Sequence, residues 1–140
     1  MFLTRECDYG IRVIRSLADG SKKTVESVAT LEHIPKKYAY KIVKKLEKGG
    51  LLESIRGRAG GYRLSRATNK FTLLDVVHAV DPNRYVNDCI KGDTECPFKS
   101  DNQRPCAVHK ELMHLQSMIE AELSSKSMDY ILGEEAYVSV

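Results

Sequence analysis

Three cysteines and a histidine stand within 21 residues of one another, at Cys89, Cys96, Cys106 and His109. Thiolates bind zinc and iron–sulfur clusters, and an imidazole can replace one of them. Cys106 and His109 are three residues apart at the expected start of a helix, so their side chains share one helical face. The lack of a Cys-x2-Cys pair weakens a zinc-ribbon interpretation. The pattern therefore predicts a metal centre, whereas Cys7, farther from this group, is expected to be a packed thiol.

The elements around these residues are a long loop and a helix. Residues 81–105 have little periodicity and contain three of the four prolines. A connection of this length is unusual in a compact domain unless it is functional or disordered. From Cys106 to about Leu123, apolar residues recur at helical spacing, and we expect this helix to pack on the first helix or on a second subunit. Its apolar positions are Val108, Leu112, Leu115, Met118, Ile119 and Leu123.

Charge is divided unevenly along the 140 residues, although the net charge is only +3. Residues 36–48 carry six lysines against one glutamate, and residues 54–66 carry four arginines and no acid. Residues 111–140 hold six acids against the single base Lys126. A basic first half suggests a bound polyanion there. The alternative is a set of solvated helix faces without a partner.

The first half of the chain predicts three helices. Residues 3–18 form an apolar stripe with Thr4 as a cap, and a second helix begins after Thr24 and buries apolar positions that include Leu31. The third helix runs from Pro35 to about Lys48 and ends at two glycines. Two helices joined by a short turn, the second of them basic, are typical of a helix-turn-helix.

The turn carries His33 where this motif usually has a glycine with positive φ. Histidine enters the left-handed region more readily than most residues do, so the motif remains compatible with the sequence. Residues 51–56 and 61–65 then predict a β-hairpin, or wing, with Arg58 in its turn. A further helix at 73–80 is preceded by the capping pattern of Thr72 and Asp75.

The positions best placed to touch DNA follow from helix geometry. The first residues of the third helix point into the major groove, and an arginine in the wing suits the narrow minor groove. Tyr38 and Tyr40 are about 200° apart around the helix, so we expect one of them to lie in the core. The candidate DNA-binding residues are Lys36, Lys37, Tyr38, Tyr40, Lys41, Arg56 and Arg58.

Several classes of protein are disfavoured. The longest apolar runs are far shorter than the roughly 20 residues of a membrane span. Charges within residues 1–8 interrupt any secretory signal, so we expect a cytoplasmic protein with reduced thiols. The chain has no nucleophile–base motif and no phosphate-binding glycine loop, which predicts neither an enzyme nor a small-molecule substrate.

The sequence resembles the iron–sulfur cluster regulator family of winged helix-turn-helix transcription factors, which includes the IscR, NsrR, RirA and CymR types. The resemblance covers nearly the whole chain and rests on residues 3–4 (LT), 34–38 (IPKKY), 56–64 (RGRAGGYRL) and 74–80 (LDVVHAV), followed by the three-cysteine loop. It implies a fold that is mainly α with a small β-hairpin wing. It also implies a homodimer that binds an imperfect palindrome in double-stranded DNA, with the long C-terminal helix as the dimer interface.

The resemblance also implies a ligand set. In the IscR type, three cysteines and a histidine hold a [2Fe–2S] cluster, which here would use Cys89, Cys96, Cys106 and His109. In the NsrR type an acid from the partner subunit replaces the histidine and the cluster can be [4Fe–4S]; Asp8 stands at that position and is the alternative fourth ligand. We favour [2Fe–2S] and His109.

These expectations divide the chain into a winged helix-turn-helix domain (1–80), a cluster-binding loop (81–109) and a dimerisation helix with a C-terminal tail (106–140). The expected regulator senses iron, redox or nitric oxide status, because the cluster sets the conformation of the loop and thereby the placement of the two DNA-reading heads. The alternatives are a zinc- or thiol-based regulator or partner-binding scaffold, which would be colourless, and an electron carrier. A basic helix and a wing argue against the electron carrier.

Overall fold

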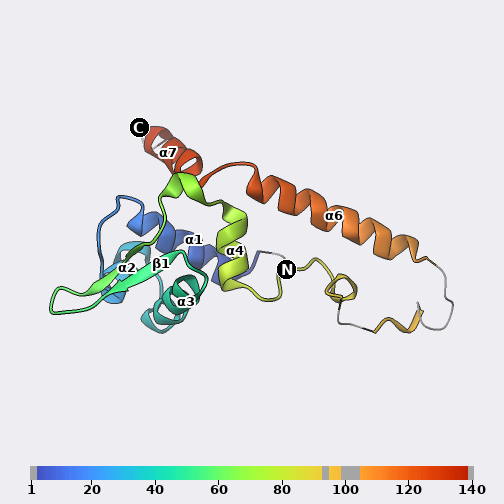
Figure 1. Cartoon of the computed structure of the whole chain (residues 1–140), viewed down its shortest axis with the longest axis horizontal. Helices are drawn as coiled ribbons and strands as arrows, with labels where there is room; N and C mark the ends of the chain where they lie inside the picture. The colour runs from blue at the N-terminus through green and yellow to red at the C-terminus, as the bar shows by residue number, and fades with distance from the viewer. Residues whose placement is uncertain (1–2, 93–94, 99–104, 139–140) are drawn as a thin grey trace.

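The structure is a computed structural model that describes residues 3–92, 95–98 and 105–138. Helices α1–α4 and a two-stranded hairpin form one body, and helix α6 extends away from it (Figure 1). This architecture confirms the expected fold, mainly α with a small hairpin wing. The elements in chain order are α1 Arg5–Leu17, α2 Val25–Glu32, α3 Lys36–Lys48, β1 Leu52–Ile55, β2 Gly61–Leu64, η1 Thr68–Lys70, α4 Leu73–Val80, η2 Asp88–Ile90, α6 Ala107–Ser124 and α7 Met128–Val138.

Local hydrogen bonds explain where the helices begin. The hydroxyl of Thr4 accepts from the backbone N–H of Cys7 at 3.4 Å, and that of Thr24 accepts from Ser27 at 3.1 Å. Thr72 and Asp75 cap α4 reciprocally, as a capping box does. These caps satisfy N–H groups that have no partner inside their helices.

The turn between α2 and α3 depends on His33. Its φ of 52° and ψ of 44° place it in the left-handed region, which confirms that histidine fills the position usually taken by glycine. The backbone N–H of Ile34 then donates to Ala29 O at 3.0 Å, which closes the end of α2. The expectation that Leu31 is buried is wrong. Leu31 is 56% exposed, because the buried face of α2 is formed by Val25, Val28 and Ala29.

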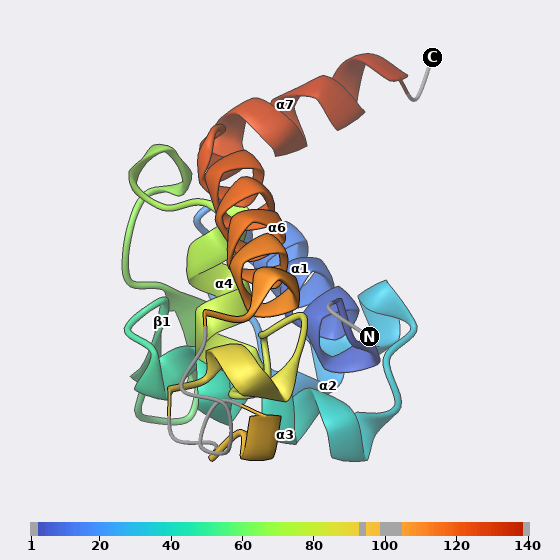
Figure 2. The ribbon, with the colours of Figure 1, turned by 90° about the vertical axis from the view of Figure 1, so that its right-hand side faces the viewer.

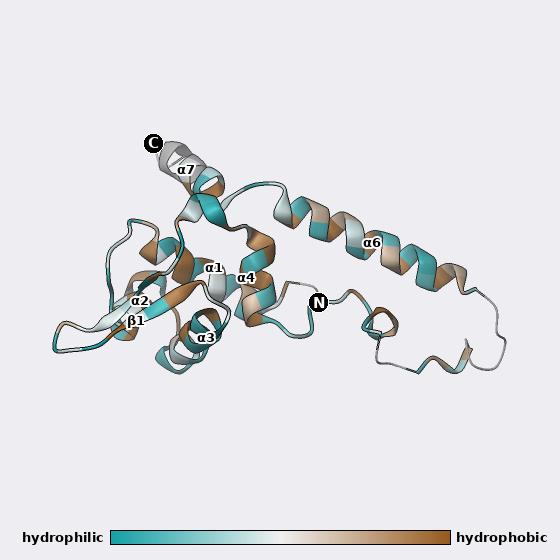
Figure 3. Ribbon diagram, in the orientation of Figure 1, coloured by the Kyte–Doolittle hydropathy of each residue, from teal (hydrophilic) through white to brown (hydrophobic). Residues whose placement is uncertain are grey.

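The core of the body lies where α1, α3 and α4 meet. Each of these helices turns an apolar stripe inward, and Figure 3 shows the hydrophobic segments facing one another there. The largest fully buried side chains are Phe71, Ile14, Leu17, Ile42, Leu46, Leu51, Met128, Val13, Val28, Val43, Val76 and Val77.

The wing is an antiparallel pair in which Leu52 lies opposite Leu64 and Ile55 opposite Gly61. Backbone hydrogen bonds between Lys23 and Tyr62, at 2.8 and 2.9 Å, attach the outer side of β2 to the segment before α2. A Cβ atom at Gly61 would lie 2.6 Å from the carbonyl oxygen of Lys23. Glycine is therefore required for this close approach. Strand β2 is thus hydrogen-bonded to β1 on one side and to the segment before α2 on the other.

Helix α6 has very little of its surface covered within the chain. Gln116 is its only buried residue, whereas Val108 and Met118 are 67% and 56% exposed. Figure 2, which views the molecule from the right-hand side of Figure 1, shows α6 in front of α4 and α1. Among the described elements, α6 packs mainly against α4 and η2.

Helix α7 occupies residues that the sequence pattern assigned to a tail. Its first residue, Met128, is fully buried, and the Met128 backbone N–H donates to Phe71 O at 2.9 Å. The chain thus returns from α6 to the body. No helix in the described part of the chain is long and apolar enough to span a membrane.

Candidate functional site

Helix α3 has one buried and one exposed face. Ala39, Ile42, Val43 and Leu46 pack into the core, and most of the remaining side chains lie on the exposed face. The five residues of α3 expected to bind DNA are all exposed, and so are Arg56 and Arg58 in the wing. Lys44 extends from α3 over the wing, with its Nζ 5.6 Å from the centre of the Tyr62 ring. α3 and the wing therefore present one basic surface.

The expectation that one of Tyr38 and Tyr40 lies in the core is wrong, since each is 44% exposed. They flank the buried Ala39 and are each turned about 100° from it, so both lie at the edges of the exposed face. The Tyr38 ring packs on Tyr9, with centroids 5.8 Å apart. The Tyr40 hydroxyl donates to Glu26, and this hydrogen bond raises the pKa of Tyr40.

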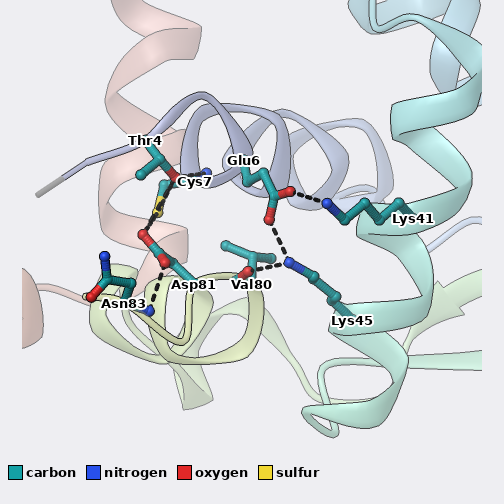
Figure 4. A network of polar contacts seen from close by, with 8 residues as sticks. All are labelled: Thr4, Glu6, Cys7, Lys41, Lys45, Val80, Asp81 and Asn83. Atoms are coloured by element: carbon teal, nitrogen blue, oxygen red, sulfur yellow. Dashed lines mark hydrogen bonds and ion pairs between the residues drawn. The ribbon is translucent and has the colours of Figure 1, made fainter. Parts of the chain in front are cut away.

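A polar network joins α3 to α1 and to the end of α4 (Figure 4). Glu6 accepts hydrogen bonds from Lys41, at 2.5 Å, and from Lys45. Lys45 also donates to Val80 O at 2.9 Å. Burial alone would raise the pKa of Glu6, but the hydrogen bonds from the two lysines outweigh it and leave the pKa below its ordinary value. Glu6 is thus a carboxylate that positions two lysines of the basic helix.

Asp81 anchors the start of the loop beside this network. Its carboxylate is buried, accepts from Thr4 Oγ1 at 3.4 Å and from the Asn83 backbone N–H at 2.8 Å, and lies 3.9 Å from Cys7 Sγ (Figure 4). Cys7 itself is fully buried, as expected of a packed thiol. The beginning of the 81–109 segment is therefore tied to the first turn of α1.

The four predicted cluster ligands line one cavity of about 480 Å³ between η2 and the start of α6. This volume falls within the range of roughly 300–1,000 Å³ that is usual for ligand pockets. Its wall consists of Asn87, Cys89, Ile90, Gly92, Cys96, Cys106, Val108, His109, Leu112 and Met113.

Hydrogen bonds to the backbone fix the positions of the cavity wall and of the loop beside it. Cys106 caps α6, with its Sγ accepting from the His109 backbone N–H at 3.4 Å. The Asn87 side chain accepts from the Cys89 backbone N–H at 3.1 Å and so begins η2. Buried Gln116 accepts from the Val86 backbone N–H at 3.0 Å, which attaches the loop to α6.

The donor set, three thiols and one imidazole around a partly apolar cavity, fits an iron–sulfur cluster. No three Cys, His, Asp or Glu side chains of the described residues are gathered closely enough to hold a metal ion as they stand. Within the predicted cluster-binding loop, residues 93–94 and 99–104 lie outside the part of the chain that the structure describes.

Asp8, the alternative fourth ligand, is exposed on α1 and does not line this cavity. Its carboxylate lies 3.1 Å from Arg12 Nη2. Within one chain, then, His109 and not Asp8 is placed beside the three cysteines.

A sequence profile of the Rrf2 family, described as "Iron-dependent Transcriptional regulator", matches residues 3–134. The chain belongs to the Rrf2 family of transcriptional regulators. This confirms the resemblance recognised in the sequence, and it agrees with a winged helix-turn-helix fold whose basic helix and wing share one surface.

Two relatives show how far this Rrf2 chain has diverged. It is 30% identical to protein aau3 of Rhizobium meliloti over 115 residues, which cover 80% of the chain and 75% of the relative. It is 29% identical over 96 residues to a protein of Aquifex aeolicus that is named as an HTH-type transcriptional regulator, covering 69% of the chain and 65% of that protein.

Solved structures share the fold of this Rrf2 chain at low sequence identity. The IscR protein of T. potens superposes with a TM-score of 0.74 at 20% identity, over 98% of this chain and 90% of that one. CymR, the global cysteine regulator of B. subtilis, superposes with a TM-score of 0.71 at 19% identity, over 94% of this chain and 95% of that one. At these identities the likeness concerns the fold.

Sequence reasoning missed three residues that organise the site of this Rrf2 chain. Glu6 and Asp81 gave no local signal, because their partners are distant in the sequence. Gln116 did carry a signal: it is a polar residue between Leu112 and Ile119, within the apolar spacing of α6. A polar residue at such a position is expected to bond to a neighbouring segment, and here it holds Val86.

Proposed function

We propose that this Rrf2 protein senses iron, redox or nitric oxide status through an iron–sulfur cluster, [2Fe–2S] in preference to [4Fe–4S], held by Cys89, Cys96, Cys106 and His109. The observation that carries the proposal is that these four side chains, spread over two elements and the loop between them, line one cavity. When bound, the cluster supplies a centre whose charge and stability depend on its redox state and ligands.

The protein's own contribution is to connect this site to α6. Cys106 is both a candidate ligand and the cap of α6, so its thiolate would lie where the N–H groups of the helix favour negative charge. A change at Cys106 therefore acts directly on the first turn of α6. The bond between Gln116 and Val86 links the next turns of α6 to the start of the same loop.

The output is DNA binding by α3 and the wing. We assign Lys36, Lys37, Tyr38, Tyr40 and Lys41 to the major groove and its phosphates, and Arg56 and Arg58 to the wing contact. The exposed apolar side chains of α6 support a homodimer. Two such subunits would read the half-sites of an imperfect palindrome, about one helical turn of DNA or a multiple apart.

Purification without oxygen, followed by a visible absorption spectrum and assays of iron and acid-labile sulfide, tests the proposal. We expect a coloured protein in which iron and sulfide are present in equal amounts. A colourless protein that contains zinc would overturn it and support a zinc-based regulator. A colourless and metal-free protein with intact DNA binding would instead support a thiol-based regulator.

A further inference from the structure

A second cavity, of about 390 Å³, lies between the ends of α3 and α4 and the first residues after α4. Every ionisable side chain in its wall is a base, and no acid lines it. The lining residues are Lys45, Lys48, Gly49, His78, Ala79, Val80, Pro82 and Arg84. Lysine, arginine and histidine converge here from three separate parts of the chain. Glu6 balances the charge of Lys45, but no acid in the wall balances Lys48 and Arg84. Like charges gathered in this way repel one another unless a negative charge is present.

Arg84 provides a second and independent observation. Its Nε atom is buried and has no hydrogen-bond partner, and no other buried side-chain nitrogen or oxygen in the described part of the chain is left unpaired. The rest of its guanidinium lies over the Tyr85 ring, 5.0 Å from the centroid. Buried polar groups without partners are rare in folded proteins, so this nitrogen is an exception that calls for an explanation.

His78 experiences the same positive surroundings. Partial burial and the nearby guanidinium of Arg84 lower the pKa of His78, although Glu120 and Asp75 act in the opposite direction. Lys45 is also held at this end of α3 by Glu6 and Val80 O. The wall therefore brings the cationic side chains of Lys45, Lys48 and Arg84 together around one cavity.

We propose that this cavity, which we call the α3–α4 pocket, binds a tetrahedral oxyanion, either free phosphate or a phosphate group of DNA, through Arg84, Lys48 and Lys45. Arginine presents a fixed fork of donors that matches phosphate oxygens, and lysine adds a point charge. The ligand differs from the cluster, and its site is separate from the cysteine cavity. Arg84 lies just after Asp81, so the bound oxyanion connects the start of the 81–109 segment to the end of the basic helix.

Amide NMR spectra of the full-length protein test this binding directly, with inorganic phosphate titrated against sodium chloride at matched ionic strength. We expect saturable shifts of the Gly49 and Ala79 amides with phosphate and not with chloride. Identical responses to the two salts would overturn the proposal. This readout needs no substitution and does not depend on a cluster.

Substitutions then locate the site. Arg84→Gln and Lys48→Gln should each weaken phosphate binding about tenfold, as expected for the loss of one charged hydrogen bond. Lys126→Gln removes the same charge from the connection between α6 and α7, where Lys126 pairs with Glu122 at 3.5 Å, and should leave the affinity unchanged. An Arg84→Gln protein that binds phosphate as tightly as the unchanged protein would contradict the assignment.

Duplex DNA distinguishes the two sources of phosphate. If the pocket takes a DNA phosphate, Arg84→Gln should also weaken DNA binding and reduce the slope of log K against log salt by about one. If the pocket takes a free oxyanion, Arg84→Gln should leave that slope unchanged while it still weakens binding of inorganic phosphate. Both results support the pocket and differ only in the origin of its ligand.

Discussion

Single side chains join the basic helix α3 and the cysteine segment to the same first turn of α1. Glu6 holds Lys41 and Lys45 of α3, while Thr4, two residues earlier, holds Asp81 at the start of the loop. Side chains of neighbouring residues in one turn thus contact both regions. A displacement of this turn would therefore move both α3 and the start of the 81–109 segment.

Glu6→Gln should lower the free energy of unfolding by about 1 kcal/mol at neutral pH, because the carboxylate is only 25% exposed and accepts from two lysines. The pKa of Glu6 is lowered in the folded state, so its contribution is present above the ordinary value of 4.5 and is lost as the pH falls through the lower folded pKa. Urea unfolding of both proteins should therefore give curves that converge in acid.

Glu122→Gln is the matched control for this experiment. Glu122 is 75% exposed and pairs with Lys126 at 3.5 Å, and pairs of this kind contribute little. A difference between Glu6→Gln and the unchanged protein that stays constant from pH 7 into acid would show that the charge of Glu6 is not the cause.

His109→Ala should lose or loosen the cluster, whereas Asp8→Ala should leave it largely intact. His109 lines the cysteine cavity in its own chain, and Asp8 is exposed and paired with Arg12. Visible spectra of the two variants, purified without oxygen, provide the measurement. The reverse pattern would mean that the fourth ligand comes from the partner subunit, as in the NsrR type.

At the level of elements, the wing and α3 form one surface because a short chain connection and two contacts fix the hairpin. β1 follows directly from the end of α3, Tyr62 pairs with Lys23, and Lys44 lies over the Tyr62 ring. The exposed turn between the strands therefore has a rigid base. In the proposed DNA contact, that rigidity would lower the entropic cost of placing Arg58 against the duplex.

Arg58→Ala should weaken binding to a specific palindrome by roughly 1–3 kcal/mol if the wing reads the minor groove. Fluorescence anisotropy with a labelled duplex, at several fixed salt concentrations, measures the change. Lys126→Ala, with the same loss of charge away from the wing, should bind like the unchanged protein. Equal affinities of Arg58→Ala and the unchanged protein at matched salt would remove Arg58 from the interface.

The whole molecule consists of a packed body and helix α6, whose surface is left largely uncovered within one chain. Val108, Leu115 and Met118 of α6 are 67%, 42% and 56% exposed, and their spacing places them on one side of this 18-residue helix. Exposed apolar side chains gathered on one long helix mark an interaction surface. We propose a second copy of the chain as its occupant, because the two halves of a palindromic DNA site would be read by two heads.

We therefore expect a homodimer at micromolar concentration, measured by sedimentation velocity. The double substitution Leu115→Glu with Met118→Glu should shift the mass to that of a monomer and weaken binding to a palindrome, because the two heads would no longer bind together. Leu31→Glu changes an equally exposed leucine on α2 and should leave the mass unchanged. A monomeric mass for the unchanged protein with its cluster intact would contradict both the dimer and the palindrome.

Much of this fold could be predicted from the sequence, because its signals are local. Thr4, Thr24 and Thr72 cap helices by bonds to residues three positions away, and His33 adopts positive φ within a single turn. The α3 boundaries and the hairpin follow from Pro35, two pairs of glycines and alternating strand residues. Each of these features depends on interactions within a few residues, which a sequence displays directly.

Only the tertiary structure decided which side chains meet across the chain. No local sequence pattern shows that Glu6 pairs with Lys45 or that Thr4 donates a hydrogen bond to Asp81. Nor does any local pattern show that Arg84 shares a cavity with Lys48. The two exposed tyrosines and buried Met128 were likewise missed, because burial depends on which elements pack together. The sequence by itself determined α1–α4, α6, the wing and the cysteine–histidine set, but not α7. Their contacts depend on how α1, α3, α4 and α6 are placed in space, since packing brings together residues that chain order separates.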